Sequence, residues 1–183
     1  DEGQILLDGE PIRFHGPRDA LARGITAVYQ ELTVLPGMSV LDNVLLGQEP
    51  TRRGLVQRAE ARRVAREVLE RVGLGALDLN ARAGTLSLAN QQLIEIARAL
   101  ARRARVLILD EPSAVLSGDK LASLFDVVRA VAAHGAAVVY ISHRLEEVIK
   151  LADDITILRD GKDVSTGFAN DYEVARIIRE MVG

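Results

Sequence analysis

Apolar residues follow two spacings along the chain, and each spacing predicts a different kind of element. Over residues 58–72 they recur every three or four positions, which predicts an amphipathic surface helix. Its other face carries arginines interleaved with glutamates, which favours a solvated face over a phosphate- or lipid-binding patch. Pro17 and Gly24 are typical of a helix start and stop. Further helices are predicted from about Asn90 onward and over residues 121–132, 145–152 and 172–181.

Short, wholly apolar runs alternate with these helices. They cover residues 25–29, 106–109, 137–141 and 155–158, and each predicts a β-strand. Buried strands that alternate with amphipathic helices are typical of a mainly parallel sheet with helices on both faces. The dipeptides Asp8-Gly9 and Asp160-Gly161 supply the positive φ of two-residue turns, so each predicts a β-hairpin. The sequence therefore predicts an α/β fold.

The amino-acid composition excludes or disfavours several classes of protein. Across 183 residues, 26 acidic and 23 basic side chains give a net charge of -3, and 48% of residues are hydrophobic. This suits a globular chain and disfavours a protein that coats nucleic acid, because such affinity comes from a basic surplus. The lack of cysteine excludes disulfides, thiolate zinc sites and cysteine nucleophiles. No apolar run approaches the roughly 20 residues that span a bilayer.

Polar side chains stand where the predicted parallel strands end, which is where ligands bind in open α/β sheets. One strand ends at Gln30, a second at Asp110-Glu111 and a third at Ser142-His143. Two adjacent carboxylates after a buried strand are costly unless a cation or reacting water occupies the site, so Asp110 is a candidate magnesium ligand and Glu111 a candidate base. Taken singly, Asp-Glu-Pro also fits a surface turn, and His143 fits a polar strand end.

The order of these features along the whole chain closely resembles the ATP-binding cassette (ABC) family. Its four motifs are Gln30 at a strand end, Leu86-Ser-Leu-Ala-Asn-Gln-Gln92 opening a helix, Asp110-Glu111-Pro112, and Ser142-His143. The resemblance implies a partial P-loop NTPase-like cassette. Its expected parts are an N-terminal hairpin and Q-loop strand (1–35), a helical subdomain with the signature motif (36–103), and an α/β core (104–183).

The resemblance implies that ATP and Mg²⁺ are the cofactors. Gln30 corresponds to the Q-loop glutamine, which senses magnesium and the γ-phosphate, and Asp110 to the Walker B aspartate that holds magnesium. Glu111 corresponds to the catalytic glutamate and His143 to the switch histidine, which stabilises charge on the transferring phosphoryl group. The signature segment would contact ATP held by a second cassette through Ser87, Leu88, Ala89, Asn90 and Gln91. For Ser87, capping of its own helix is the simpler alternative.

Three departures from the family pattern stand in the sequence. Ala89 replaces the usual signature glycine, and Ser117 stands where many relatives have an aspartate. The chain also has no G-x-x-x-x-G-K-[ST] string, whose backbone N–H groups and lysine cradle phosphate. We therefore expect a cassette fragment without its N-terminal strands, Walker A loop and following helix, and one that does not bind ATP alone.

Longer strings resemble the first cassette of the tandem ATPases of bacterial monosaccharide importers. They are Gly24-Ile-Thr-Ala-Val-Tyr-Gln30-Glu-Leu, Leu41-Asp-Asn-Val-Leu-Leu-Gly47, Tyr140-Ile-Ser-His-Arg-Leu-Glu-Glu147 and Met181-Val-Gly183. The implied protein is a peripheral ATPase subunit at the cytoplasmic face of the cell membrane, energising the import of simple sugars. Its implied partners are a second cassette, transmembrane permease subunits and, indirectly, a periplasmic or extracellular sugar-binding protein, with no nucleic acid.

Three other functions stay open at this point. Nucleoside importers are close relatives of the sugar importers. The chain alone also fits a non-catalytic interaction module that offers its signature face to another cassette and residues 30–47 to a membrane subunit. A soluble ABC protein that acts on ribosomes or DNA fits less well, because its basic insertions are not seen.

Overall fold

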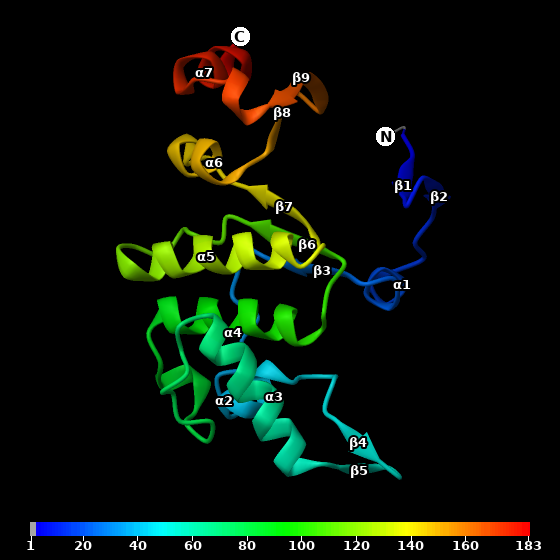
Figure 1. Cartoon of the computed structure of the whole chain (residues 1–183), viewed down its shortest axis with the longest axis vertical. Coiled ribbons are helices and arrows are strands. Elements are labelled where there is room, and N and C mark those ends of the chain that lie inside the picture. The colour runs from blue at the N-terminus through cyan, green and yellow to red at the C-terminus, as the bar shows by residue number, and fades with distance from the viewer. Residues whose placement is uncertain (1–2) are drawn as a thin grey trace.

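A three-stranded parallel sheet lies at the centre of the computed structural model, which describes residues 3–183 (Figure 1). The strands β3 (Ile25–Val28), β6 (Val106–Asp110) and β7 (Ala137–Ile141) lie in the order β3-β6-β7. All neighbours run parallel, with Val28 opposite Leu109 and Asp110 opposite Ile141. The three predicted strands and their parallel arrangement are therefore confirmed.

Helices α4 (Leu88–Ala101) and α5 (Asp119–Ala133) pack into one core with the sheet. Below α4 in Figure 1 lie α3 (Arg58–Arg71) and α2 (Val40–Val44), which also join this core. The predicted helix over 58–72 is confirmed, and α4 starts two residues earlier than predicted. The largest fully buried apolar side chains of this core are Leu69, Leu93, Ile94, Ile96, Leu107, Leu109 and Leu124.

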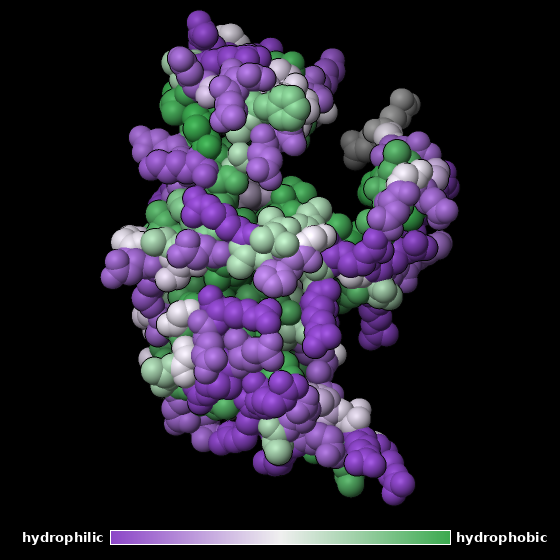
Figure 2. All heavy atoms as spheres, in the orientation of Figure 1, coloured by the Kyte–Doolittle hydropathy of each residue, from purple (hydrophilic) through white to green (hydrophobic). Residues whose placement is uncertain are grey.

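The outward face of α3 is the solvated face that the sequence favours. Arg63 pairs with Glu60 at 2.6 Å, and Arg71 pairs with Glu67 at 2.6 Å, all four side chains being largely exposed. Figure 2 shows hydrophilic surface over this helix. Arg63 and Arg71 are thus engaged along their own helix, and Arg62 and Arg66 donate to the segment 75–80 that follows it, so these four arginines do not form a free basic patch.

Only one face of the sheet is covered by the described residues. Leu107 and Leu109 of β6 are 1% and 0% exposed, whereas Val139 and Ile141 of β7, on the opposite face, are each 47% exposed. Helices α4 and α5 both share the core of the first face. Since neighbouring positions along a strand point to opposite faces, the half-exposed side chains of β7 mark the face that α4 and α5 do not cover. The expectation that helices cover both faces is therefore wrong for residues 3–183.

Both predicted hairpins are present. Asp8 and Gly9, with φ of 55° and 80°, join β1 (Ile5–Leu7) to β2 (Glu10–Ile12). Asp160 and Gly161, with φ of 52° and 73°, join β8 (Asp154–Arg159) to β9 (Lys162–Phe168). These positive values are those a two-residue hairpin turn needs.

The remaining elements are short or C-terminal. The predicted helices α1 (Pro17–Ala22), α6 (Leu145–Leu151) and α7 (Val174–Val182) are confirmed. The small hairpin of β4 (Thr51–Arg52) and β5 (Leu55–Val56) was not predicted, and neither were the single-turn helices at Ala83–Thr85 and Ala169–Asp171. A second, smaller core lies at the C-terminal end and contains Ile155, Ile157, Ala169, Tyr172 and Ile177.

Across residues 3–183, no helix is both long and apolar enough to cross a membrane. The division of the chain at residues 35/36 and 103/104 stays a prediction.

Candidate functional site

The parallel register brings four candidate residues to one edge of the sheet. Asp110 ends β6 directly opposite Ile141, the last residue of β7, so Glu111 and His143 leave the sheet at the same level. Gln30 follows β3 by two residues and is exposed. This is the carboxyl edge of the strands, where the sequence predicted a ligand site.

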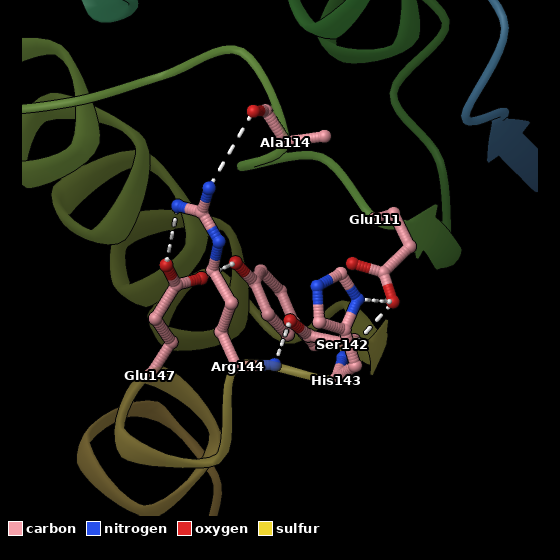
Figure 3. A network of polar contacts seen from close by, with 7 residues as sticks. Glu111, Ala114, Ser142, His143, Arg144 and Glu147 are labelled. Atoms are coloured by element: carbon pink, nitrogen blue, oxygen red, sulfur yellow. Dashed lines mark hydrogen bonds and ion pairs between the residues drawn. The ribbon is translucent and has the colours of Figure 1, made fainter.

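Glu111 and His143 are in direct contact at this edge (Figure 3). The backbone N–H of His143 donates to Oε1 of Glu111 at 2.9 Å, and His143 Nδ1 lies 2.8 Å from the same oxygen. An ionised carboxylate can only accept, so it places a proton on Nδ1 of the imidazole. The carboxylate is 15% exposed and the imidazole 73% exposed. The pair thus joins a nearly buried acid to an accessible ring.

The backbone fixes Glu111 in an unusual conformation. Its φ of 49° lies in the left-handed region, which a non-glycine residue rarely adopts. Its N–H donates to the carbonyl of Ile141 at 2.9 Å, which continues the β6–β7 ladder beyond the strand. The other carboxylate oxygen, Oε2, is buried and has no hydrogen-bond partner among the described residues. A buried carboxylate oxygen without a donor is costly, so this atom is a candidate contact for a water molecule or an ion.

A second polar network holds the loop that carries His143 (Figure 3). The Tyr140 hydroxyl donates to Glu147 Oε2 at 2.9 Å, and Arg144 donates to Glu147 Oε1 at 3.2 Å. Burial raises the pKa of Tyr140, so its hydroxyl stays a donor. Arg144 also donates to the carbonyl of Ala114 at 3.5 Å, and its N–H donates to Ser142 Oγ at 3.0 Å. The network ties the loop after β7 to the loop after β6.

The predicted signature segment forms the first turn of α4. Ser87 Oγ accepts the backbone N–H of Asn90 at 3.3 Å, so the serine caps its own helix. Gln91 donates from its side chain to the carbonyl of Leu86 at 2.9 Å. Leu88 is exposed, whereas Ala89 is partly buried against the main core.

One contact links this turn to a distant part of the chain. Lys120, in the first turn of α5, donates its ammonium to Asn90 Oδ1. Ser117, which precedes α5, is exposed.

The candidate residues form two separate groups. Within residues 3–183, no hydrogen bond or ion pair joins the turn at Ser87–Gln91 to Glu111, His143 or Gln30. Those described residues also contain no cluster of three or more His, Asp or Glu side chains placed to hold a metal. Asp110 and the orphaned oxygen of Glu111 are nonetheless hard oxygen donors of the kind that Mg²⁺ binds together with substrate oxygens.

Sequence reasoning missed Lys120, Arg144 and Glu147. Lys120 donates to Asn90, Arg144 donates to the carbonyl of Ala114, and Glu147 accepts from Tyr140, and these contacts depend on the tertiary arrangement. The one available signal was the Ser-His-Arg-Leu-Glu-Glu string itself, in which Arg144 and Glu147 stand three residues apart at a helix start, the spacing of a side-chain pair on a helix.

Similar solved structures define the class of fold. The chain aligns over its whole length with MJ1267, an ATP-binding cassette of an ABC transporter, at a TM-score of 0.80 and 24% identity, covering 78% of that chain. It aligns over 92% of its length with a dimeric ATP-binding cassette bound to ADP and phosphate, at a TM-score of 0.78 and 24% identity, covering 74% of that chain. The fold is therefore that of an ATP-binding cassette.

The sequence comparisons place the chain in a family. The family model described as ABC transporter matches residues 1–114, and the chain belongs to this family. The ribose import ATP-binding protein RbsA 3 of Rubrobacter xylanophilus is 45% identical over 181 residues. That alignment covers 99% of this chain but 36% of the relative, so the chain spans about a third of the length of the curated relatives it matches.

Proposed function

We propose that this chain is part of a longer ATPase that binds and hydrolyses ATP to energise an ABC importer of simple sugars. The observation that carries this proposal is the Glu111–His143 pair, held 2.8 Å apart at the carboxyl edge of the sheet beside an unpartnered buried oxygen of Glu111. An acid in this position suits the orientation of an attacking water. The sugar preference is supported by the 45% identity to a protein named for ribose import.

Within this proposal each residue at a strand end has a separate role in ATP hydrolysis. Glu111 accepts a proton from the attacking water and holds that water in line. The exposed imidazole of His143 turns toward the transferring phosphoryl group and stabilises its charge. Asp110 and Gln30 would hold Mg²⁺, which supplies positive charge that neutralises the phosphate oxygens.

The turn at Ser87–Gln91 has a separate role in the proposal. Its backbone N–H groups and hydroxyl at the start of the 14-residue helix α4 suit an anion, here the γ-phosphate of ATP held by a second cassette. The similar cassette bound to ADP and phosphate is dimeric, which supports pairing of two cassettes. Ala89 adds a methyl group where close approach favours glycine, so contact at this position is weakened.

The remaining proposed partners follow from the importer function. They are transmembrane permease subunits and, indirectly, a periplasmic or extracellular sugar-binding protein. The ATPase would then lie peripherally at the cytoplasmic face of the cell membrane. A nucleoside importer is the alternative within the same class, and uptake assays with radiolabelled ribose and a nucleoside distinguish the two.

The central test is the substitution Glu111→Gln in the longer ATPase. Because the amide cannot accept a proton, we expect ATP turnover to fall by about 10²–10⁴-fold while ATP still binds. Glu146→Gln is the matched control, since Glu146 is exposed on the neighbouring helix and lacks a contact with the pair. Turnover retained in Glu111→Gln, measured as phosphate release, would show that this carboxylate is not the base.

A second candidate function for the isolated chain is that of a non-catalytic interaction module. It is favoured by the absence of a G-x-x-x-x-G-K-[ST] string from these 183 residues. Titration calorimetry of the isolated 183-residue chain with Mg-ATP tests this second candidate. We expect no binding at micromolar concentrations, and a micromolar dissociation constant would contradict the module.

A further inference from the structure

A buried glutamate outside the proposed catalytic pair connects the two groups of candidate residues. Glu95 lies on α4, two turns beyond Ser87, and is 4% exposed. Its Oε1 accepts both the backbone N–H and the hydroxyl of Thr33, the latter at 2.7 Å. Thr33 follows Gln30 by three residues. The helix that starts at Ser87 therefore holds the segment that leaves Gln30.

Arg98 extends this contact. It donates to Thr33 Oγ1 at 3.1 Å, so the threonine hydroxyl lies between an acid and a base of the same helix. Burial lowers the pKa of Arg98, and the nearby carboxylate of Glu95 opposes that shift. Arg98 also donates to the carbonyl of Asn43 at 2.8 Å and to its side-chain oxygen at 3.2 Å. Bonds of this kind, which involve an ionised partner, are stronger than neutral ones.

Asn43 fixes the same segment at its other end. This side chain is fully buried on α2, and its Oδ1 accepts the N–H of Leu35 at 2.8 Å. Its amide donates to the carbonyl of Leu35 at 3.0 Å and to that of Ser39 at 3.0 Å. Residues 33–35 are thus held at both ends by α2 and α4 rather than by the sheet they have just left.

Gln30 lies between the central sheet and the segment that α2 and α4 hold. Gln30 is exposed and lies two residues beyond the end of β3, between that strand and the bonded residues that follow it. Those residues are bonded to a regular 14-residue helix whose first turn contains Ser87. Hydrogen bonds therefore connect the segment after Gln30, through Thr33 and Glu95, to α4.

We propose that Glu95 is a positioning residue that ties the Gln30 segment to the helix beginning at Ser87, so that the two predicted nucleotide contacts move together. The nucleotide part of this inference rests on the proposed function, whereas the mechanical link does not.

The link is tested by spin labels on the 183-residue chain, which has no native cysteine. Labels at Glu31→Cys and Leu88→Cys, both exposed, report the distance between the two sites. Glu95→Met keeps the side-chain length but removes both acceptors, and we expect the distance distribution to become at least about twice as broad. Glu95→Gln keeps a carbonyl acceptor and is expected to restore a narrow distribution. A narrow distribution in Glu95→Met would overturn the proposal.

Two further variants separate the link from general stability. Glu147→Met removes another buried glutamate, one that contacts Tyr140 and Arg144, and it should leave the distance distribution unchanged. Thr33→Val removes the bridging hydroxyl from a segment at the surface. It replaces Glu95→Met as the test of the link if Glu95→Met does not fold. Thr33→Ser keeps the hydroxyl and should behave as the unmodified chain. Equal broadening in the serine and valine variants would also contradict the link.

A kinetic measurement tests the functional part in the longer ATPase. Loss of the link leaves ATP binding in place but disturbs assembly of the two contacts, so Glu95→Met should lower kcat about tenfold and change KM for ATP by less than about twofold. A raised KM with an unchanged kcat would contradict the positioning role. If the unmodified protein does not hydrolyse ATP, the proposed function fails, and the spin-label result still decides the link.

Discussion

The two groups of candidate residues, at the sheet edge and in the first turn of α4, depend on different kinds of contact. Glu111 and His143 lie 32 positions apart in the chain and meet because β6 and β7 pair in one register. Ser87 and Asn90 lie three positions apart and meet because one helix turn brings them together. The first contact requires the folded sheet, whereas the second forms wherever α4 forms. Substitutions that disturb the sheet should therefore affect the first group far more than the second.

The largest expected effect comes from the covered face of the sheet. Leu109 is fully buried beside the site, so Leu109→Ala should lower the free energy of unfolding by about 2–5 kcal/mol, since it leaves a cavity. Val139→Ala, on the open face, should cost less than about 1 kcal/mol. Urea denaturation of the 183-residue chain measures both. Equal costs would mean that the open face is as well packed as the covered one.

The second prediction separates catalysis from folding. His143 is largely exposed, so His143→Ala should leave the unfolding free energy nearly unchanged. In the longer ATPase it should nevertheless lower turnover by about 10²-fold, because a charge-stabilising group is lost. His134→Ala is the control, since that histidine is exposed and, within residues 3–183, its ring hydrogen-bonds to the carbonyl of Ala130 rather than to a candidate residue. Similar turnover in the two variants would remove His143 from the proposed mechanism.

The difference between local and long-range contacts also explains what the sequence predicted. The hairpins at Asp8-Gly9 and Asp160-Gly161, the three strands and α3 depend on spacing within one segment, and all are confirmed. The strand-end positions of Gln30, Asp110 and His143 follow from the same local patterns. Their roles toward a nucleotide came from the family resemblance and stay predictions.

What the sequence did not predict depends on contacts between distant segments. The Glu111–His143 hydrogen bond, the Lys120–Asn90 contact and the Thr33–Glu95 contact have no signature in spacing along the chain. The open face of the sheet was also not predicted, because an apolar strand such as residues 137–141 has the same composition whether one or both faces are covered. The single-turn helix α2 is too short for its period to be recognised.

The third prediction tests the local group. Ser87→Ala removes the cap of α4 and should cost about 1 kcal/mol in unfolding free energy of the 183-residue chain. Ser87→Asp keeps a capping oxygen and should restore most of that stability. In the longer ATPase, however, the added negative charge should weaken ATP-driven pairing of cassettes, measured by size-exclusion chromatography. Unimpaired pairing in Ser87→Asp would limit Ser87 to its capping role.

The smallest expected effect concerns the hydrogen bond between Lys120 at the start of α5 and Asn90 in the first turn of α4. Lys120→Met removes the ammonium that donates to Asn90 but keeps the aliphatic stem. Because this contact lies near the surface and Asn90 can bond to water instead, the loss of unfolding free energy should stay within about 1 kcal/mol. Asp119→Asn, a change at the neighbouring exposed residue, is the control for altered charge. If Lys120→Met lowered the free energy of unfolding as much as Leu109→Ala, the first turn of α4 would depend on the tertiary fold. The contrast with the Glu111–His143 pair would then be lost.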